Sequence, residues 1–177
     1  MKNQLNNKIY IIGSVASGKT TMAKELSQLL NIPWHELDNV FHMRLPGGDA
    51  RKTPEERAIE FRKIINSEKW IIEGVIRECF NEGFEKADAI ILLNTPPFKR
   101  KFRIAKRWIC QRLKLEKSNY SPTFKMLKRM YKWSSGFEKS RENTLKILEP
   151  YNDKVIILKD NTDVFDMYIK GSDVDVV

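Results

Sequence analysis

The sequence has few of the residues that form disulfides or bind transition metals. Among its 177 residues there are two cysteines, Cys79 and Cys110, and two histidines. The cysteines do not have the spacing of a metal site, so we expect two free, buried thiols in a reducing compartment. No apolar run approaches the 18 residues of a membrane span. Disulfide-rich secreted proteins and integral membrane proteins are therefore excluded, and a soluble cytoplasmic protein that does not act at a membrane is expected.

Signals for targeting and for domain boundaries are missing as well. The N-terminal residues M-K-N-Q-L-N-N-K are polar and lack the apolar core of a signal peptide. No internal repeat or low-complexity linker interrupts the chain, and its composition is that of an ordinary globular protein. A chain of this length can bury one sizeable core. We therefore predict a single domain over residues 1–177.

Acidic residues are nearly absent from one segment. Between Phe98 and Trp133 there are thirteen lysines and arginines and a single acid, Glu116. This segment has a net charge of +12, whereas the whole chain has +9, so the remaining residues sum to −3. A region this basic requires an anionic partner, such as nucleotide phosphates, nucleic acid or an acidic membrane.

Short apolar runs alternate with helical patterns along the chain. Strands are predicted over residues 8–12, 33–37, 70–72, 89–93 and 154–158. Helices are predicted over residues 20–30, 54–66, 78–86, 98–116, 122–149 and 163–170. Thr53 is the expected N-cap of the second helix, and residues 39–53, which contain Pro-Gly-Gly, are predicted to form a loop. The alternation indicates an α/β sandwich with a mostly parallel sheet.

A phosphate-binding loop is predicted where the first strand meets the first helix. Residues 11–21 read I-I-G-S-V-A-S-G-K-T-T and contain the pattern G-x4-G-K-T. Its backbone N–H groups and the positive end of the helix can hold phosphates, with Lys19 on the β and γ phosphates and the Thr20 hydroxyl on Mg²⁺. The alternative is an ordinary strand-to-helix turn with a solvated lysine. The residues expected to bind ATP are Gly13, Ser14, Ala16, Ser17, Gly18, Lys19, Thr20 and Thr21.

Two further segments favour a small kinase over other phosphate-loop proteins. The guanine-reading N-K-x-D of GTPases is missing, and so is the terminal Asp or Asp-Glu of motor and helicase strands. The segment I-E-G-V-I-R, residues 72–77, resembles the D-G-F-P-R segment of adenylate-kinase-like enzymes, where the glycine makes room for substrate and the arginine grips an anion. That resemblance implies an acceptor site at Glu73, Gly74 and Arg77, although Glu73 and Arg77 can also form a surface ion pair. Asp38 in H-E-L-D is the expected metal-placing residue or general base.

The order of five segments resembles that of the small P-loop kinases known as DNA-topology-modulation proteins, which are relatives of adenylate and shikimate kinases. The segments are G-S-V-A-S-G-K-T-T, H-E-L-D, W-I-I-E-G, A-D-A-I-I-L-L-N-T-P-P and the arginine-rich helix. The resemblance covers roughly residues 8–160. It implies a three-layer α/β sandwich with a five-stranded parallel sheet in the order 2-3-1-4-5 and a helical lid.

The basic segment is predicted to supply that lid. Phe98, Phe102, Ala105, Ile109 and Leu113 recur at helical spacing and are expected to form its buried stripe. Arg100, Arg103 and Arg107 recur on another face, which is unfavourable unless an anion lies there. Because phosphoryl transfer needs positive charge around the moving group, Arg103 and Arg107 are the predicted catalytic arginines, together with Lys19 and Asp38. A solvated basic face is the alternative.

Two functions remain open at this point. The favoured one is an enzyme that transfers the γ-phosphoryl group of ATP, with Mg²⁺, to a small-molecule or nucleotide acceptor bound beside residues 39–66. The other is a nucleotide-dependent regulator that binds DNA through the basic lid region, residues 98–133; its affinity would fall steeply with salt. The kinase is favoured because one nucleotide site already accounts for several of the cations. The acceptor is not identified, and either a monomer or a homodimer is compatible with the sequence.

Overall fold

A computed structural model describes residues 7–45, 49–116 and 122–163. The elements, in chain order, are β1 (Lys8–Gly13), α1 (Lys19–Leu30), β2 (Trp34–Glu36), α2 (Leu37–Phe41), β3 (His42–Met43), β4 (Ala50–Arg51), α3 (Pro54–Ile65), β5 (Trp70–Gly74), a 3-10 helix (Glu78–Phe80), α4 (Glu82–Lys86), β6 (Ala89–Leu93), α5 (Pro97–Arg112), α6 (Phe124–Lys139), α7 (Arg141–Leu148), a second 3-10 helix (Glu149–Lys154) and β7 (Val155–Leu158). No helix among these residues is long and apolar enough to cross a membrane.

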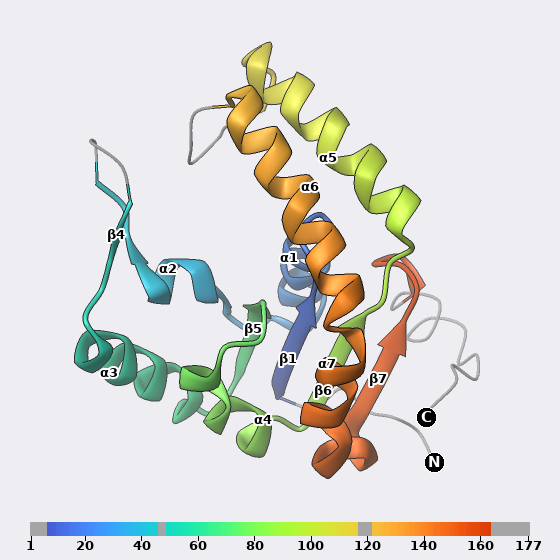
Figure 1. Cartoon of the computed structure of the whole chain (residues 1–177). Helices are drawn as coiled ribbons and strands as arrows, with labels where there is room; N and C mark the ends of the chain where they lie inside the picture. The colour runs from blue at the N-terminus through green and yellow to red at the C-terminus, as the bar shows by residue number, and fades with distance from the viewer. Residues whose placement is uncertain (1–6, 46–48, 117–121, 164–177) are drawn as a thin grey trace.

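A parallel sheet forms the centre of the molecule (Figure 1). Its strands lie in the order β2-β5-β1-β6-β7, and every neighbouring pair is parallel. Numbered by their appearance in the chain, these five strands follow the order 2-3-1-4-5, so the predicted fold is confirmed. The connections are all crossovers, as parallel pairing requires.

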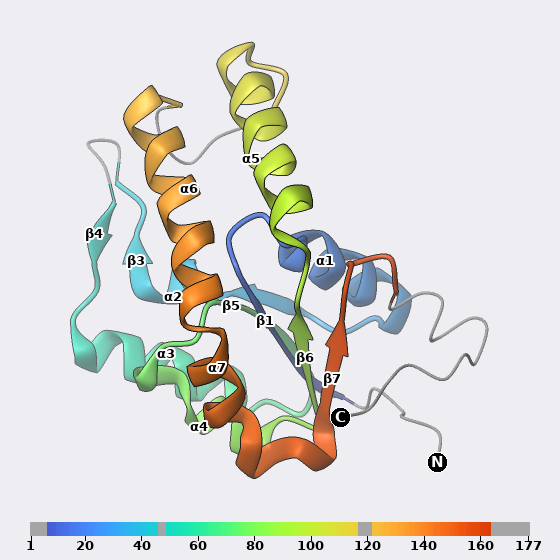
Figure 2. The ribbon, with the colours of Figure 1, turned by 45° about the vertical axis from the view of Figure 1, so that its right-hand side comes forward.

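Helices cover both faces of the sheet. Along β1, Ile9 and Ile11 are buried with residues of α1, whereas Tyr10 and Ile12 are buried with residues of α3, α4 and α7. This alternation follows from the two-residue period of a strand, which sends successive side chains to opposite faces. Figure 2 shows α1 on one side of the sheet and α3, α4 and α7 on the other.

Two predicted segments differ from the structure. Residues 39–53 are not a simple loop, because the last turn of α2 and the antiparallel pair β3–β4 lie within them. Their order comes from packing, since Leu37 and Val40 of α2 are buried in the core. The helix predicted over 122–149 is divided into α6 and α7 at Ser140. The helix predicted over 163–170 extends beyond the described residues.

The helices α5 and α6 pack side by side and project from the sheet as a hairpin (Figures 1 and 2). The predicted buried stripe of α5 was wrong: Phe98 and Phe102 are each 69% exposed. The buried positions are instead Arg100, Ile104 and Gln111. Arg100 tolerates burial because it donates to the carbonyl oxygen of Ser134 at 3.2 Å and pairs with Glu138, both on α6.

The N-terminus of α3 carries the predicted cap, and it provides a test of local stability. The Thr53 hydroxyl accepts the backbone N–H of Glu56 at 3.2 Å, and the Glu56 carboxylate accepts the N–H of Thr53 at 2.8 Å. Replacing Thr53 with alanine removes one half of this capping box, so the free energy of unfolding should fall by about 1 kcal/mol. Urea unfolding measures the change. Thr53→Ser is the control and should retain most of the stability; equal losses in both variants would contradict the capping role.

Candidate active site

The loop between β1 and α1 has the conformation and the open polar groups that a phosphate requires. Ala16 and Gly18 have left-handed backbone with φ of 58° and 104°, and Gly18 is the N-cap of α1. The first N–H groups of a helix have no partners within the helix, and they favour an anion. The hydroxyls of Ser14 and Ser17 are buried with no hydrogen-bond partner among the described residues. The loop therefore fits the phosphates of a nucleotide.

Lys19 lies among three carboxylates at the carboxyl edge of the sheet. Its Nζ donates to the carbonyl oxygen of Ser14 at 2.8 Å. Burial lowers the pKa of Lys19, whereas the negative charges of Glu73, Asp38 and Glu36 oppose that change. The three acids meet here because parallel strands end at one edge, and Glu36 is in register with Glu73 on the neighbouring strand. Glu36 was not among the predicted site residues, although its place near the end of a predicted strand is a signal that could have identified it.

Glu73 contacts the loop rather than the acceptor side. It is 2% exposed, and its Oε1 accepts a hydrogen bond from the Thr20 hydroxyl at 2.6 Å. Burial raises the pKa of Glu73, and the Lys19 charge and the Thr20 hydrogen bond act in the opposite direction. The resemblance to D-G-F-P-R implied substrate binding by Glu73, but its observed contact is with the predicted metal ligand.

The donor set fits Mg²⁺ in the company of a nucleotide. Hydroxyl and carboxylate oxygens are hard ligands of the kind that Mg²⁺ takes, and this ion usually keeps waters and substrate phosphates in its shell. Thr20 supplies the hydroxyl, and Glu73 and Asp38 supply carboxylates nearby. Within the described ranges no group of three His, Cys, Asp or Glu side chains can hold a metal ion alone. A metal here would therefore depend on ligands from the phosphates.

A second group of predicted residues lies beside α2 and α3. Arg77 Nη2 donates to Asp38 Oδ1 at 2.7 Å, so the structure brings these two predicted residues together. The guanidinium of Arg77 lies 4.5 Å from the centre of the Phe41 ring, and that of Arg57 lies 4.4 Å from the same ring. Arg57 was missed because its place beside Phe41 depends on how α3 packs against α2. At Gly74, an added Cβ would come within 2.8 Å of Leu37 Cβ, so this glycine makes room for α2.

The predicted catalytic arginines of α5 differ in their surroundings. Arg103 donates from Nη1 to the carbonyl oxygen of Ser17 at 2.8 Å, and from Nη2 to Asp160 at 2.6 Å and Asn161 at 3.0 Å. It therefore links the hairpin to the phosphate loop and to the loop after β7. Arg107 forms no hydrogen bond or ion pair with the described residues, and its charge helps to lower the pKa of Lys19.

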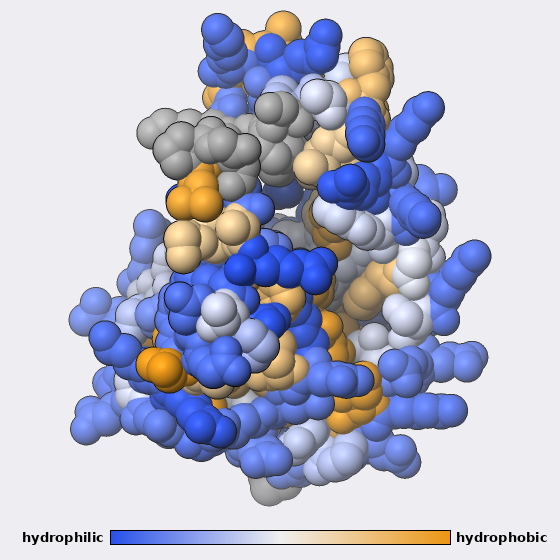
Figure 3. Space-filling view, turned by 60° about the vertical axis from the view of Figure 1, so that its left-hand side comes forward, coloured by the Kyte–Doolittle hydropathy of each residue, from blue (hydrophilic) through white to orange (hydrophobic). Residues whose placement is uncertain are grey.

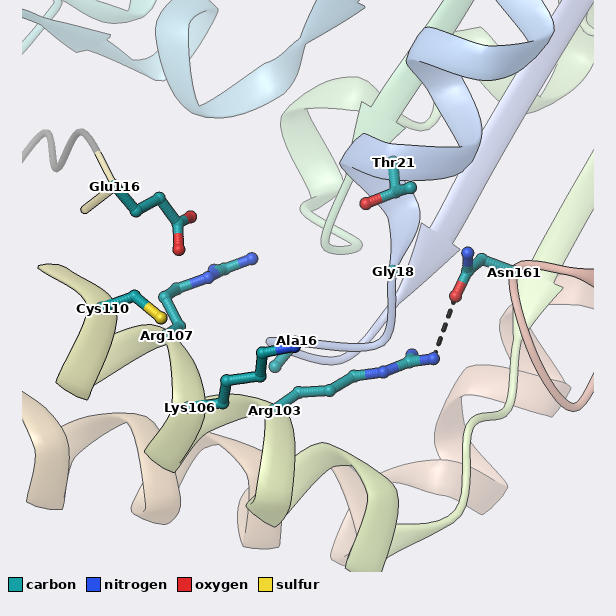
Figure 4. A pocket seen from close by; sticks show the side chains of 9 residues that line it. All are labelled: Ala16, Gly18, Thr21, Arg103, Lys106, Arg107, Cys110, Glu116 and Asn161. Carbon is teal, nitrogen blue, oxygen red and sulfur yellow. Dashed lines mark hydrogen bonds between the residues drawn. The ribbon is translucent and has the colours of Figure 1, made fainter.

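A cavity of about 320 Å³ lies between the phosphate loop and α5 (Figure 4). Figure 4 shows Arg107 extending from α5 into the space in front of the loop, and Arg103 reaching past the loop to Asn161. Cys110 also lines the cavity, while Cys79 is exposed; both are free, as predicted, but neither is fully buried. The lining residues are Ala16, Gly18, Thr21, Arg103, Lys106, Arg107, Cys110, Glu116 and Asn161.

Comparisons with known proteins identify the family and the fold. Residues 9–121 match the model of a family described as an AAA domain, and the chain belongs to that family. Its fold is similar to that of an uncharacterized protein from Eubacterium ventriosum ATCC 27560, with 19% identity and a TM-score of 0.52 over 94% of this chain and 98% of that chain. It is also similar to shikimate kinase from Acinetobacter baumannii in complex with shikimate, with 14% identity and a TM-score of 0.52 over 94% of each chain.

At these identities the structural likeness describes the fold alone. Comparison with curated proteins gives no significant match. The family, the fold and the phosphate loop together define a P-loop, nucleotide-binding protein with a kinase-like fold.

The ionic contacts of Asp160 give the site a testable pH dependence. Burial raises the pKa of Asp160, but the hydrogen bonds from Lys99 and Arg103 outweigh it and leave the pKa below its ordinary value of 3.8. A carboxylate with a lowered pKa stabilises the fold above that ordinary value, and the stabilisation is lost as the pH falls. Asp160→Asn should therefore reduce the free energy of unfolding by about 1 to 3 kcal/mol near neutral pH.

The difference in the free energy of unfolding between wild type and Asp160→Asn should decrease as the pH falls below about 3.8. Urea unfolding from pH 3 to pH 7, followed by tryptophan fluorescence, measures it. Asp153→Asn removes an exposed carboxylate and controls for the loss of one negative charge. A difference that stays constant over the whole pH range would contradict the role given to the Asp160 carboxylate.

Proposed function

We propose that the protein transfers the γ-phosphoryl group of ATP to a small-molecule or nucleotide acceptor. One arrangement of residues carries the proposal. Around the phosphate loop lie Lys19, the Thr20–Glu73 pair and Arg107, and the Asp38–Arg77 pair lies next to them. Phosphoryl transfer depends mainly on the positioning of groups and the stabilisation of charge, and this edge supplies cations on both sides of a phosphate site.

Each residue has a distinct part in this proposal. The loop from Gly13 to Thr21 holds the phosphates of ATP through its N–H groups. Lys19 and Arg107 stabilise negative charge on the transferred group, while Arg103 holds α5 against the loop. Thr20, with Glu73 and Asp38 nearby, would hold Mg²⁺, which supplies neutralisation of charge on the phosphate oxygens. Asp38, oriented by Arg77, would accept the proton of an acceptor hydroxyl.

The acceptor in this proposal carries an anionic group. Arg57 and Arg77 both lie against Phe41, and in the described part of the chain Arg57 has no ion pair with an acid. Figure 3 brings the side of the molecule with α3 and β4 forward and shows a mostly hydrophilic surface there. We assign the acceptor site to this region, residues 39–66 together with Gly74 and Arg77, and the lid to residues 98–133.

The resemblance to the DNA-topology-modulation proteins remains part of the proposal, as does a single domain over residues 1–177. The free state of Cys79 and Cys110 suits a reducing cytoplasm. Binding of DNA by the basic segment is the competing function, and no contact among the described residues of that segment favours it over a nucleotide lid.

The proposal is tested first by ADP formation from ATP and Mg²⁺ in the presence of candidate acceptors. The panel contains nucleoside monophosphates, nucleosides, polyols with and without a carboxylate, and duplex DNA. A small anionic acceptor should stimulate ADP formation, and Lys19→Ala should reduce it by at least about a hundredfold because charge stabilisation at the phosphate is lost. Circular dichroism confirms that the variant is folded. Turnover of Lys19→Ala at the wild-type level, or stimulation by DNA alone that disappears with salt, would overturn the kinase.

Arg57 allows the acceptor site to be tested separately from the phosphate loop. Arg57→Gln removes a cation beside Phe41 without leaving an acid unpaired, so the half-saturating concentration of the anionic acceptor should rise by about tenfold or more. The affinity for ATP should not change. Arg62→Gln on the same helix is the matched control, because Arg62 is 67% exposed and faces Glu82. Equal effects of the two substitutions would remove Arg57 from the acceptor site.

A further inference from the structure

The α5 helix exposes a row of large apolar side chains, which we call the α5 ridge. It consists of Phe98, Phe102, Ile109 and Leu113, which directly follows α5, with exposed fractions of 69%, 69%, 50% and 63%. Their spacing of four, seven and four residues places them on one side of the helix. The buried residues of α5 lie on the opposite side, against α6 and the phosphate loop. The ridge therefore points away from the protein.

Basic residues border the ridge on both sides. At 100° per residue, Lys99 and Lys106 lie along one flank of the helix, and Lys101 and Arg112 lie along the other. Of these four, only Lys99 has an ion pair with a described residue, Asp160, and Lys106 also lines the cavity beside the phosphate loop. Single exposed apolar residues are common on proteins, but an aligned row with cations beside it marks an interaction surface.

In contrast to the expectation from the sequence that the protein does not act at a membrane, we propose that the α5 ridge docks onto a membrane surface that contains anionic lipids. A helix with an apolar face and flanking lysines lies in the plane of such a surface, with its apolar side chains at the boundary of headgroups and acyl chains. Lys101 and Arg112, which lie on the flank away from the cavity, would extend toward the acidic headgroups while their stems cover apolar surface. The described length of α5, 16 residues, corresponds to about 24 Å, and Figure 1 shows α5 along the outer side of the projecting hairpin.

The charge distribution favours lipid over the other occupants of an apolar ridge. A second copy packed ridge to ridge would bring together two segments with a charge of +12 each, with lysines beside lysines. Duplex DNA would match the charge. Proteins contact the DNA backbone through cations and hydrogen-bond donors, so the four large apolar side chains of the ridge would have no partner there. An anionic membrane surface accommodates both the charge and the apolar row.

This inference goes beyond the proposed kinase activity and does not depend on it. Arg103 and Arg107 face the cavity on the inner side of α5, whereas the ridge faces outward. Membrane binding is therefore measured without nucleotide, and its failure would leave the phosphoryl-transfer proposal untouched.

The test is cosedimentation of the full chain with vesicles, either of phosphatidylcholine alone or with 30% phosphatidylglycerol, at 0.15 M salt. The ridge variant is Phe102→Ser with Ile109→Ser. The matched control is Leu29→Ser with Ile59→Ser, because these residues of α1 and α3 are 52% and 72% exposed and lie outside the ridge. Wild type and control should bind the anionic vesicles equally, and the ridge variant should bind at least about tenfold more weakly.

Three results would overturn the proposal. The first is a wild-type protein that does not bind the anionic vesicles. The second is binding that the ridge variant retains in full, since charge alone would then account for it. The third concerns the oligomeric state measured by light scattering. If the wild type is a dimer and the ridge variant is a monomer, the ridge is an interface between copies. Duplex DNA is titrated in parallel, so that in the first case a loss of DNA binding by the ridge variant would identify DNA as the occupant.

Discussion

The charge of Lys19 is the constraint on which the carboxyl edge of the sheet depends. A lysine held against the phosphate loop loses much of its hydration, and that loss favours the neutral amine. The negative charges of Glu73, Asp38 and Glu36 act in the opposite direction, and Glu36 and Glu73 lie side by side because β2 and β5 pair in parallel. Glu73 is itself buried and accepts a hydrogen bond from Thr20. The charges of Lys19 and Glu73 each favour the ionised form of the other, against the effect of burial.

The helical hairpin is attached to this edge by charged contacts more than by apolar ones. Arg100 is fully buried and joins α5 to α6, and Arg103 joins α5 to the phosphate loop and to the loop after β7. A small apolar cluster of Ala16, Ile104 and Met130 lies between them. Breaking the contacts of the buried Arg100 guanidinium would leave a buried charge unpaired, so these contacts hold α5 against α6. The apolar residues of the helix are then left on its outer side.

The sequence predicted those features that depend on neighbours in the chain. The phosphate loop, the strand Ala89–Leu93 and the Thr53 cap could be recognised because each has a local pattern, and the structure contains all of these elements. The buried face of α5 could not be recognised in this way, because the burial of Arg100 depends on hydrogen-bond acceptors of α6. These acceptors lie 34 and 38 residues further along the chain. Arg57 was missed for the same reason. Its place beside Phe41 arises from proximity in space, which periodicity and spacing do not encode.

The positions of Arg100 and Arg103 also determine how the hairpin can move. Both lie in the first two turns of α5, and their contacts fix those turns to α6, to the phosphate loop and to the loop after β7. The base of the hairpin could turn as a whole only if these contacts broke. Any closure over a nucleotide that kept them would bend the outer turns of α5, where Arg107 has no ion pair among the described residues. Such a bend changes the direction of the distal end of α5 while its root stays in place.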